Sequence, residues 1–197
     1  MVFCCRSERG RAEYAGEGIF IWLSGAAVAR VSAMAETVHL YLKANGQDIQ
    51  GESTQLDLGR ENSIECLSFK DSVRTARERG SRAAVGRRVH EPVVIVKRID
   101  KSSPLLAKAL CRNEKIEGEF KFFRPSPKGD GATEQFFTVK IEGGRVDSIE
   151  RVSPNAIDPA ESMCPPMETI AFVYASIRWT YVPSGAEFED KWSHSDG

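Results

Sequence analysis

Histidine and cysteine are the side chains of this sequence that could do metal or acid–base chemistry, so their spacing decides whether such a site is present. The three histidines, His39, His90 and His194, lie far apart, and none has a cysteine or carboxylate at metal-ligand spacing. The five cysteines include no CxxC pair, and an odd, widely spaced set argues against a disulfide framework or a zinc site. We therefore expect no metal and no cofactor, and we expect Cys66 and Cys111 to be buried thiols.

The motifs of nucleophilic catalysis and of phosphate binding are absent from the sequence. It contains no GxSxG, GxxxxGK[ST] or GxGxxG segment. The segment Gly129-Asp130-Gly131 lacks the further carboxylates of a calcium loop, and a hairpin turn explains it. We expect no catalytic residues, and a hydrolase with a dispersed site is the least favoured interpretation.

An arginine-rich segment is the clearest candidate for a functional surface. Residues 74–88 read RTARERGSRAAVGRR, show no hydrophobic period and are expected to form a long, exposed loop. Because long loops without order are uncommon in compact domains, contact with a neighbouring subunit, an acidic protein or nucleic acid is favoured over a solvated tip. The residues expected to make this contact are Arg74, Arg77, Arg79, Arg82, Arg87 and Arg88.

Length and composition allow one domain with flanking segments. The chain has 197 residues, of which 41% are hydrophobic, and its net charge of −1 gives no overall attraction to nucleic acid or anionic membrane. The apolar run at 19–29 is too short to span a bilayer, and the segment before it is a poor signal-peptide start. We interpret residues 1–33 as a mis-assigned start or a disordered extension, with a cleaved signal as the less favoured alternative. The folded domain is expected at 34–183, followed by a loose polar tail at 184–197.

The two-residue alternation of β-strands covers most of the remaining chain. Residues 36–44 alternate strictly between apolar and polar side chains, and Asn45-Gly46 then supplies a tight turn. The segment 168–182 alternates over its whole length and is expected to be one long strand with an unbroken apolar face. The other expected strands cover 63–73, 89–99, 115–125, 133–142 and 145–153, with Gly143-Gly144 as the turn between the last two.

A single short helix is expected at about 103–112. Ser103 has the side chain of an N-cap, and Pro104 fits the first helical position. Leu106 and Leu110 lie four residues apart on one apolar stripe, and Asn113 is a plausible stop. A helix this short needs a sheet to hold it. The expected fold is mainly β, an antiparallel β-barrel of two sheets with this helix on its side and the long loop at about 74–88.

Several of these segments resemble the Hcp family, the tube proteins of the bacterial type VI secretion system. The most specific is RIDKSSP (98–104), which is similar to a family motif that ends a strand and begins the single helix. The family patterns are also similar to GES (51–53), IECLSF (64–69) and ETIAFVYASIRWTYVP (168–183). The order and spacing of these segments make the resemblance specific over roughly residues 36–183.

The resemblance implies a structural protein that six copies assemble into a ring with an open lumen. Rings stack into a tube, which sheath and spike proteins of the apparatus accompany, and small effectors bind in the lumen of some members. The protein is then made in the bacterial cytoplasm and exported by the apparatus without a cleaved signal peptide. Residues 74–88 occupy the place of the loop that reaches the adjacent ring, and the residues expected to face the lumen are Cys66, Ser68 and Lys70.

The arginines distinguish the expected stacking loop from that of the family, where the loop is often glycine-rich and uncharged. The stacking contact is therefore expected to be electrostatic and sensitive to salt. The alternative function is a small β-barrel that uses the basic loop to bind nucleic acid or an acidic protein. The tube function predicts neither nucleic-acid binding nor a membrane anchor.

Overall fold

The described part of the chain folds into antiparallel sheets with one helix, as the alternating sequence predicts. The computed structural model describes residues 36–77, 84–159, 161 and 164–191. Within these ranges the secondary structure comprises β1 (Thr37–Ala44), β2 (Gln47–Ile49), β3 (Ile64–Cys66), β4 (Ser68–Lys70), β5 (Val73–Arg77), β6 (Ala84–His90), β7 (Val93–Arg98), α1 (Ser103–Cys111), β8 (Ile116–Pro125), β9 (Thr133–Val152), β10 (Met167–Val173), β11 (Ser176–Tyr181) and β12 (Ala186–Lys191).

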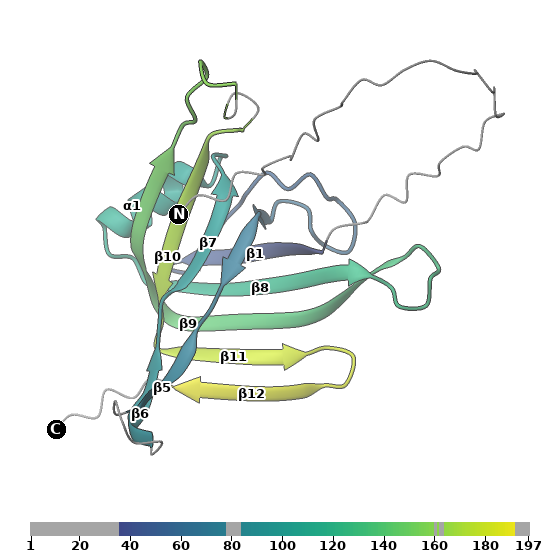
Figure 1. Cartoon of the computed structure of the whole chain (residues 1–197), viewed down its shortest axis with the longest axis vertical. Helices are drawn as coiled ribbons and strands as arrows, with labels where there is room; N and C mark the ends of the chain where they lie inside the picture. The colour runs from purple at the N-terminus through teal and green to yellow at the C-terminus, as the bar shows by residue number, and fades with distance from the viewer. Residues whose placement is uncertain (1–35, 78–83, 160, 162–163, 192–197) are drawn as a thin grey trace, which may run out of the picture.

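Two sheets share the strand β9 (Figure 1). The first, here called sheet A, has the order β2-β1-β8-β9-β11-β12, and the second, sheet B, has the order β9-β10-β7-β4. All of these pairs are antiparallel. In Figure 1 the strands of sheet A lie one below another, whereas β7 and β10 run across them. The mainly β fold with one short helix is therefore confirmed.

β3 and β4 connect the far sides of the two sheets. β3 pairs with β1 of sheet A and β4 pairs with β7 of sheet B, and Leu67 alone separates them. The backbone N–H of Leu67 donates to the carbonyl of Val96 at 2.7 Å, so the ladder continues through the junction. The strand pairs thus run round a complete circuit. The sequence predicted a single strand over 63–73, and the bend at Leu67 is what lets this segment change partners.

The glycine pair at 143–144 lies inside a strand, which corrects the expected turn. β9 runs without interruption from Thr133 to Val152 and passes from sheet A into sheet B at this point. A side chain at Gly144 would lie 2.6 Å from the carbonyl oxygen of Val173, and Gly143 has a φ of +64°. Glycine is needed here because the backbone bends and packs closely against β10, not because the chain reverses.

The segment expected as one long strand from 168 to 182 is instead β10 followed by β11. β10 pairs with the second half of β9 and β11 pairs with the first half, so the chain must turn from one sheet into the other at Tyr174 and Ala175. Ala175 is exposed, which breaks the predicted apolar face. The polar tail at 184–197 was expected to be loose, but its residues 186–191 form β12 and pair with β11.

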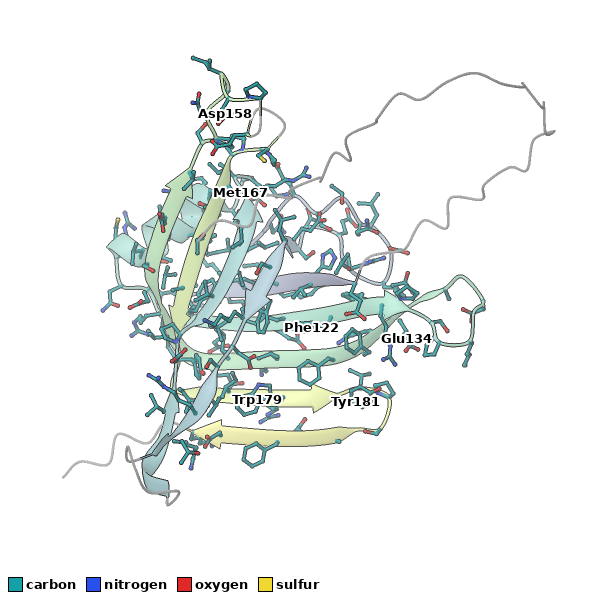
Figure 2. The ribbon with its side chains drawn as sticks, in the orientation of Figure 1. Phe122, Glu134, Asp158, Met167, Trp179 and Tyr181 are labelled. Atoms are coloured by element: carbon teal, nitrogen blue, oxygen red, sulfur yellow. The ribbon has the colours of Figure 1, made fainter. Side chains whose placement is uncertain are left out.

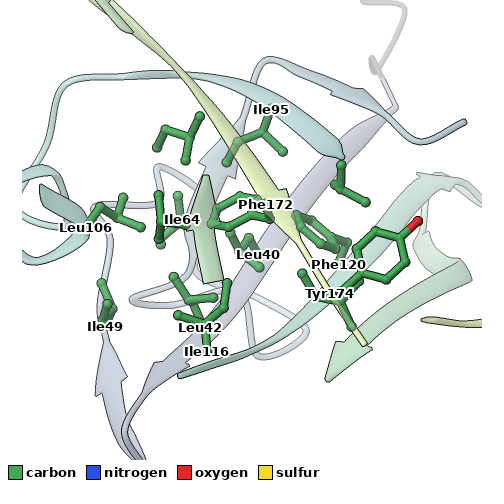
Figure 3. Packing of buried hydrophobic residues seen from close by; sticks show 14 of the residues in the cluster. Leu40, Leu42, Ile49, Ile64, Ile95, Leu106, Ile116, Phe120, Phe172 and Tyr174 are labelled. Carbon is green, nitrogen blue, oxygen red and sulfur yellow. The ribbon is translucent and has the colours of Figure 1, made fainter. Parts of the chain in front are cut away.

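The core lies between the two sheets and is closed on one side by α1 (Figure 3). Leu40, Phe120 and Phe172 are fully buried, and Leu106 and Ala109 bring the helix onto the same cluster. Burial of large apolar side chains is the main stabilising term in such a core. The apolar stripe predicted for the helix is therefore confirmed for Leu106, which is buried, and for Leu110, which packs partly buried against the cluster, whereas Leu105 is exposed.

The start of α1 differs from the prediction, whereas its end agrees with it. Ser102, not Ser103, precedes the helix, and neither its side chain nor that of Ser103 caps it: Ser103 is the first helical residue and Pro104 the second. Asn113 ends the helix as expected, with a φ of +49°. Cys111, predicted to be buried, is exposed on the last turn.

Candidate functional site

The arginine-rich segment forms a two-stranded ribbon that extends beyond both sheets (Figure 1). β5 and β6 pair with each other in the register Val73 with His90 and Thr75 with Arg88, and with neither sheet. The expectation of a long unordered loop over 74–88 is thus wrong for the described part of the segment. Arg79 and Arg82 lie outside the described residues, and only the backbone of Arg77 and Arg87 is described.

The two arginines whose side chains are described, Arg74 and Arg88, bind acidic residues of the same chain. Arg74 Nε lies 3.3 Å from Glu91 Oε1, and its side chain remains 68% exposed. Arg88 forms a two-pronged ion pair with both carboxylate oxygens of Asp190 on β12. Both described arginines lie at the base of the ribbon, and acidic residues of the same chain partly neutralise their positive charge there.

A buried polar cluster fixes the base of the ribbon to the rest of the fold. His90 Nε2 lies 2.8 Å from Asp190 Oδ2, and His90 Nδ1 lies 3.2 Å from the hydroxyl of Tyr174. His90, Tyr174 and Asp190 are all buried. Hydrogen bonds from Arg88 hold the pKa of the Asp190 carboxyl below its usual range, and burial raises the pKa of Tyr174 to about 12. We call this set, with Arg88, the ribbon anchor.

A second contact joins the start of the ribbon to β11. The indole Nε1–H of Trp179 donates to Asp71 Oδ2 at 2.7 Å, and Asp71 lies between β4 and β5. The Trp179 ring also stacks on His90 with an interplanar angle of 20°. The ribbon is thereby held at both of its strands. Side chains from β6, from the β10–β11 corner, from β11 and from β12 meet at this place. Figure 2 labels Trp179 on β11.

The residues expected to face a lumen divide into two groups. Ser68 and Lys70 are exposed, and they pair across sheet B with Val96 and Val94 of β7. Cys66 is 6% exposed and belongs to the core cluster, where burial raises the pKa of its thiol to about 12. Its side chain therefore cannot line a lumen, which corrects that expectation, while its prediction as a buried thiol is confirmed.

The RIDKSSP segment builds a buried ion network, not a surface. Lys97 is 1% exposed, and its ammonium lies 2.7 Å from Asp100 Oδ1 and 2.9 Å from Glu168 Oε1. Glu168 is also buried. Its carboxylate accepts a hydrogen bond from the hydroxyl of Ser103 at 2.6 Å and forms an ion pair with Arg151 at 2.8 Å. Buried charges are tolerated only when they are paired in this way. The network ties the start of α1 to β7, β9 and β10.

The sequence analysis missed this network, although a signal was present. In VVIVK (93–97), Lys97 is in phase with the inward residues Val93 and Ile95, and Glu168 is in phase with Ile170. A lysine and a glutamate that both lie on the inward face of neighbouring strands indicate a buried pair.

His39 is buried in the fold and has no arrangement suited to catalysis. Its Nδ1 lies 2.9 Å from Ser63 Oγ, while its Nε2 has no hydrogen-bond partner. Burial, and then the charge of Arg60, lower the pKa of His39 to about 4, so the ring is neutral. The alternation of residues 36–44 puts His39 among the polar side chains of its strand, so its complete burial corrects that expectation. No group of three or more metal-ligating side chains occurs in the described part of the chain. Nor does any helix within those ranges have the length and apolarity of a membrane span.

Comparison with known proteins relates this geometry to one family. The sequence model of the family described as "Type VI secretion system effector, Hcp" matches residues 41–181. The "Major exported protein" of Pseudomonas aeruginosa is 33% identical over 135 residues, which cover 68% of this chain and 77% of that protein.

Solved structures agree with the sequence matches. A crystal structure of an Hcp protein has a TM-score of 0.71 and 25% identity, and the match covers 81% of this chain and 99% of that one. The Hcp1 protein from E. coli EAEC 042 has a TM-score of 0.69 and 28% identity, over 81% of this chain and 100% of that one. Both the fold and the sequence motifs therefore point to the same group of proteins.

Proposed function

Because this chain belongs to the Hcp family of type VI secretion proteins, we propose that six copies form a ring and that rings stack into the inner tube of the apparatus. Proteins of this family are structural and secreted components of that system, not enzymes. Residues 34–183 are the unit that assembles, together with the β12 strand at 186–191 that the structure adds to it. The sheath and spike of the apparatus are the other partners.

The observation that carries the proposal is the projecting ribbon of β5 and β6. It leaves both sheets and is anchored at its base by buried polar contacts, so it is held in a defined direction. A ribbon that pairs with neither sheet has strand edges without a partner among the described residues, and a neighbouring subunit can use them. Its arginines suit an acidic surface of the adjacent ring, and such a contact weakens as salt rises.

The outer face of sheet B supports a lumen that accepts small effectors. Ser68, Lys70, Val94 and Val96 present short or apolar side chains with one ammonium group at the edge. In the proposed ring this face lines the channel, and Lys70 is the residue that contacts cargo. Export follows through the apparatus itself, without a cleaved signal peptide.

The test is the mass of the full chain by light scattering at low and high salt. A mass near six subunits in both, with larger stacked species at low salt only, supports the proposal. Replacing Arg77, Arg79 and Arg82 with serine should abolish the stacked species and leave the ring, whereas the matched change of Lys43, Lys115 and Lys128 should leave both. A monomer at every concentration would overturn the proposal. Tight, salt-dependent binding of nucleic acid by that monomer would favour the alternative function.

A further inference from the structure

The segment between β2 and β3, residues 51–63, forms a strap over the face of β1 that points away from the core. The two ends of the strap meet, because the N–H of Gly51 donates to the carbonyl of Asn62 at 2.9 Å. Near its middle, the hydroxyl of Tyr41 on β1 donates to the carbonyl of Gly59 at 2.7 Å. A compact loop with its ends close together is an Ω-loop, a class that frequently carries function.

The strap covers the ring of His39. This ring is fully buried, and its Nδ1 lies 2.9 Å from Ser63 Oγ at the end of the strap. Phe123 contacts the ring edge to face with centroids 5.5 Å apart, and the guanidinium of Arg60 lies 4.9 Å from the centroid of Phe123. Arg60 is buried as well and pairs with Asp57 inside the strap. His39 is therefore enclosed between sheet A and the strap.

The hydrogen bonds determine which nitrogen of His39 carries the proton. Ser63 has one hydroxyl hydrogen, which it donates to the carbonyl of Arg60 at 2.7 Å, so its oxygen accepts from Nδ1–H of His39. Nε2 is then the basic nitrogen of the neutral ring, and it has no hydrogen-bond partner within the part of the chain that the structure describes. A proton at Nε2 would create a buried charge whose N–H has no acceptor there.

The charged groups around His39 also oppose its protonation. Arg60 faces it from the strap, and Lys121, which pairs with Glu119 at 3.6 Å, lies opposite it on β8. Glu65, opposite His39 on β3, is the carboxylate that favours the protonated ring. Burial, and then the charge of Arg60, outweigh Glu65 and lower the pKa of His39 to about 4. The closed strap therefore holds a neutral histidine.

We propose that the strap is a lid that opens when mildly acidic solution protonates His39. A ring in contact with water binds a proton at higher pH than the ring under the strap, so proton uptake favours the open form. Leu58 adds to this tendency, because its φ of +55° is strained for a leucine and opening relieves the strain. Opening changes the surface, since it uncovers Phe123 and lets the exposed leucines at 56 and 58 move. This device goes beyond the proposed tube function and does not depend on it.

The test is amide hydrogen exchange of the full chain, followed by mass spectrometry and expressed as protection factors, which remove the intrinsic effect of pH. Protection of residues 51–63 should fall about 30-fold between pH 7.5 and pH 5 if the uncovered ring regains the ordinary pKa of 6.5. Protection of α1 should not change. The protein concentration is one at which light scattering gives the same particle mass at both pH values, so that assembly does not contribute.

Two variants test the role of His39. In His39→Asn the amide can still donate to Ser63 but cannot take up the proton, so protection of the strap should no longer depend on pH. Glu65→Gln leaves the buried ring in place and removes the carboxylate that favours its protonation, so opening should begin at a lower pH than in the parent chain. Glu61→Gln, which changes an exposed acid of the strap itself, is the matched control and should open as the parent does.

Three outcomes would overturn the inference. The first is protection of the strap that stays constant down to pH 5 in the parent chain. The second is an equal loss of protection in the strap and in α1, which would show that the whole fold opens. The third is a loss that persists in His39→Asn or starts at the same pH in Glu65→Gln, which would show that another group controls the strap.

Discussion

His90 and Asp190, one hundred residues apart in the sequence, meet with 2.8 Å between Nε2 and Oδ2 in the interior of the protein. Arg88 binds the same carboxylate from the surface. The contact joins the arginine ribbon to the last strand of the fold. The direction of a surface ribbon is thus set by a residue that lies at the end of the described chain.

The ribbon anchor should fail when its carboxylate loses charge. Asp190→Asn leaves Arg88 and His90 without their ion partner, and we expect a loss of about 1–3 kcal/mol in the free energy of unfolding. Amide hydrogen exchange should rise in residues 84–90 in particular. Glu187→Gln, an exposed acid on the same strand, is the control and should change neither quantity. Unchanged exchange in Asp190→Asn would show that the ribbon is held elsewhere.

The same carboxylate makes stability fall in strong acid. Arg88 lowers the pKa of Asp190 in the folded state, so its stabilisation is complete above the pKa of an ordinary carboxyl and is lost as the pH falls through the lower, folded value. The difference in thermal stability between the parent chain and Asp190→Asn should therefore be large at pH 7 and shrink below about pH 4. A difference that does not change with pH would contradict this assignment.

Protonation of His39 should also lower the stability of the protein, at a higher pH than protonation of Asp190 does. Its pKa is about 4 when folded and 6.5 when unfolded, so the unfolded chain binds more protons between these values. Stability should fall as the pH decreases from 6.5 toward 4. In His39→Asn, whose amide can still bond Ser63, the slope of Tm against pH in this range should be flatter. An equal slope in both chains would show that another group titrates.

The buried ion network should tolerate removal of a charge poorly. Lys97→Met leaves Glu168 and Asp100 without their ammonium partner, and we expect a loss of about 3–5 kcal/mol. Lys101→Met, which removes an exposed lysine from the same segment, should lower Tm far less. The double variant Lys97→Met with Glu168→Gln should recover part of the loss. If Lys97→Met and Lys101→Met had the same Tm, the network would have no role in stability.

The close approach of β9 and β10 should make Gly144 intolerant of any side chain. In Gly144→Ala the new methyl group meets the carbonyl oxygen of Val173, a backbone atom that cannot move alone. We expect a loss of about 1–3 kcal/mol, measured by urea unfolding. Gly118→Ala is the control: the atoms nearest to its methyl group belong to the side chains of Ile141, Leu40 and Leu42, each 3.3 Å away, and not to the backbone. Equal losses would show that space is not the reason for Gly144.

Alternation in the sequence predicted the strands well but not where they change partners. Residues 37–44 and 116–125 are strands throughout, as expected. The break at Tyr174 and the passage of β9 through Gly143-Gly144 were missed. The alternation of apolar and polar residues shows which face of a strand is apolar, but it does not show which strand pairs with it. A pair of glycines is equally compatible with a turn and with close packing of backbones.

The functional surface was predicted in composition and not in structure. The arginine segment was identified, but its ribbon and the anchor of His90, Tyr174 and Asp190 depend on residues from three separate regions. No spacing along the chain could bring them together. The same holds for Lys97 and Glu168, whose pairing needs the register of β7 on β10.

Strand β9 belongs to both sheets, and this has a consequence for how the protein unfolds. Neither sheet can come apart as an independent unit, because its loss would remove half of a strand whose other half is still paired. Among the described residues, the two sheets thus have no boundary between them at which one could open alone, and their opening is cooperative. A force applied at one edge of either sheet is therefore shared by the backbone hydrogen bonds of both sheets.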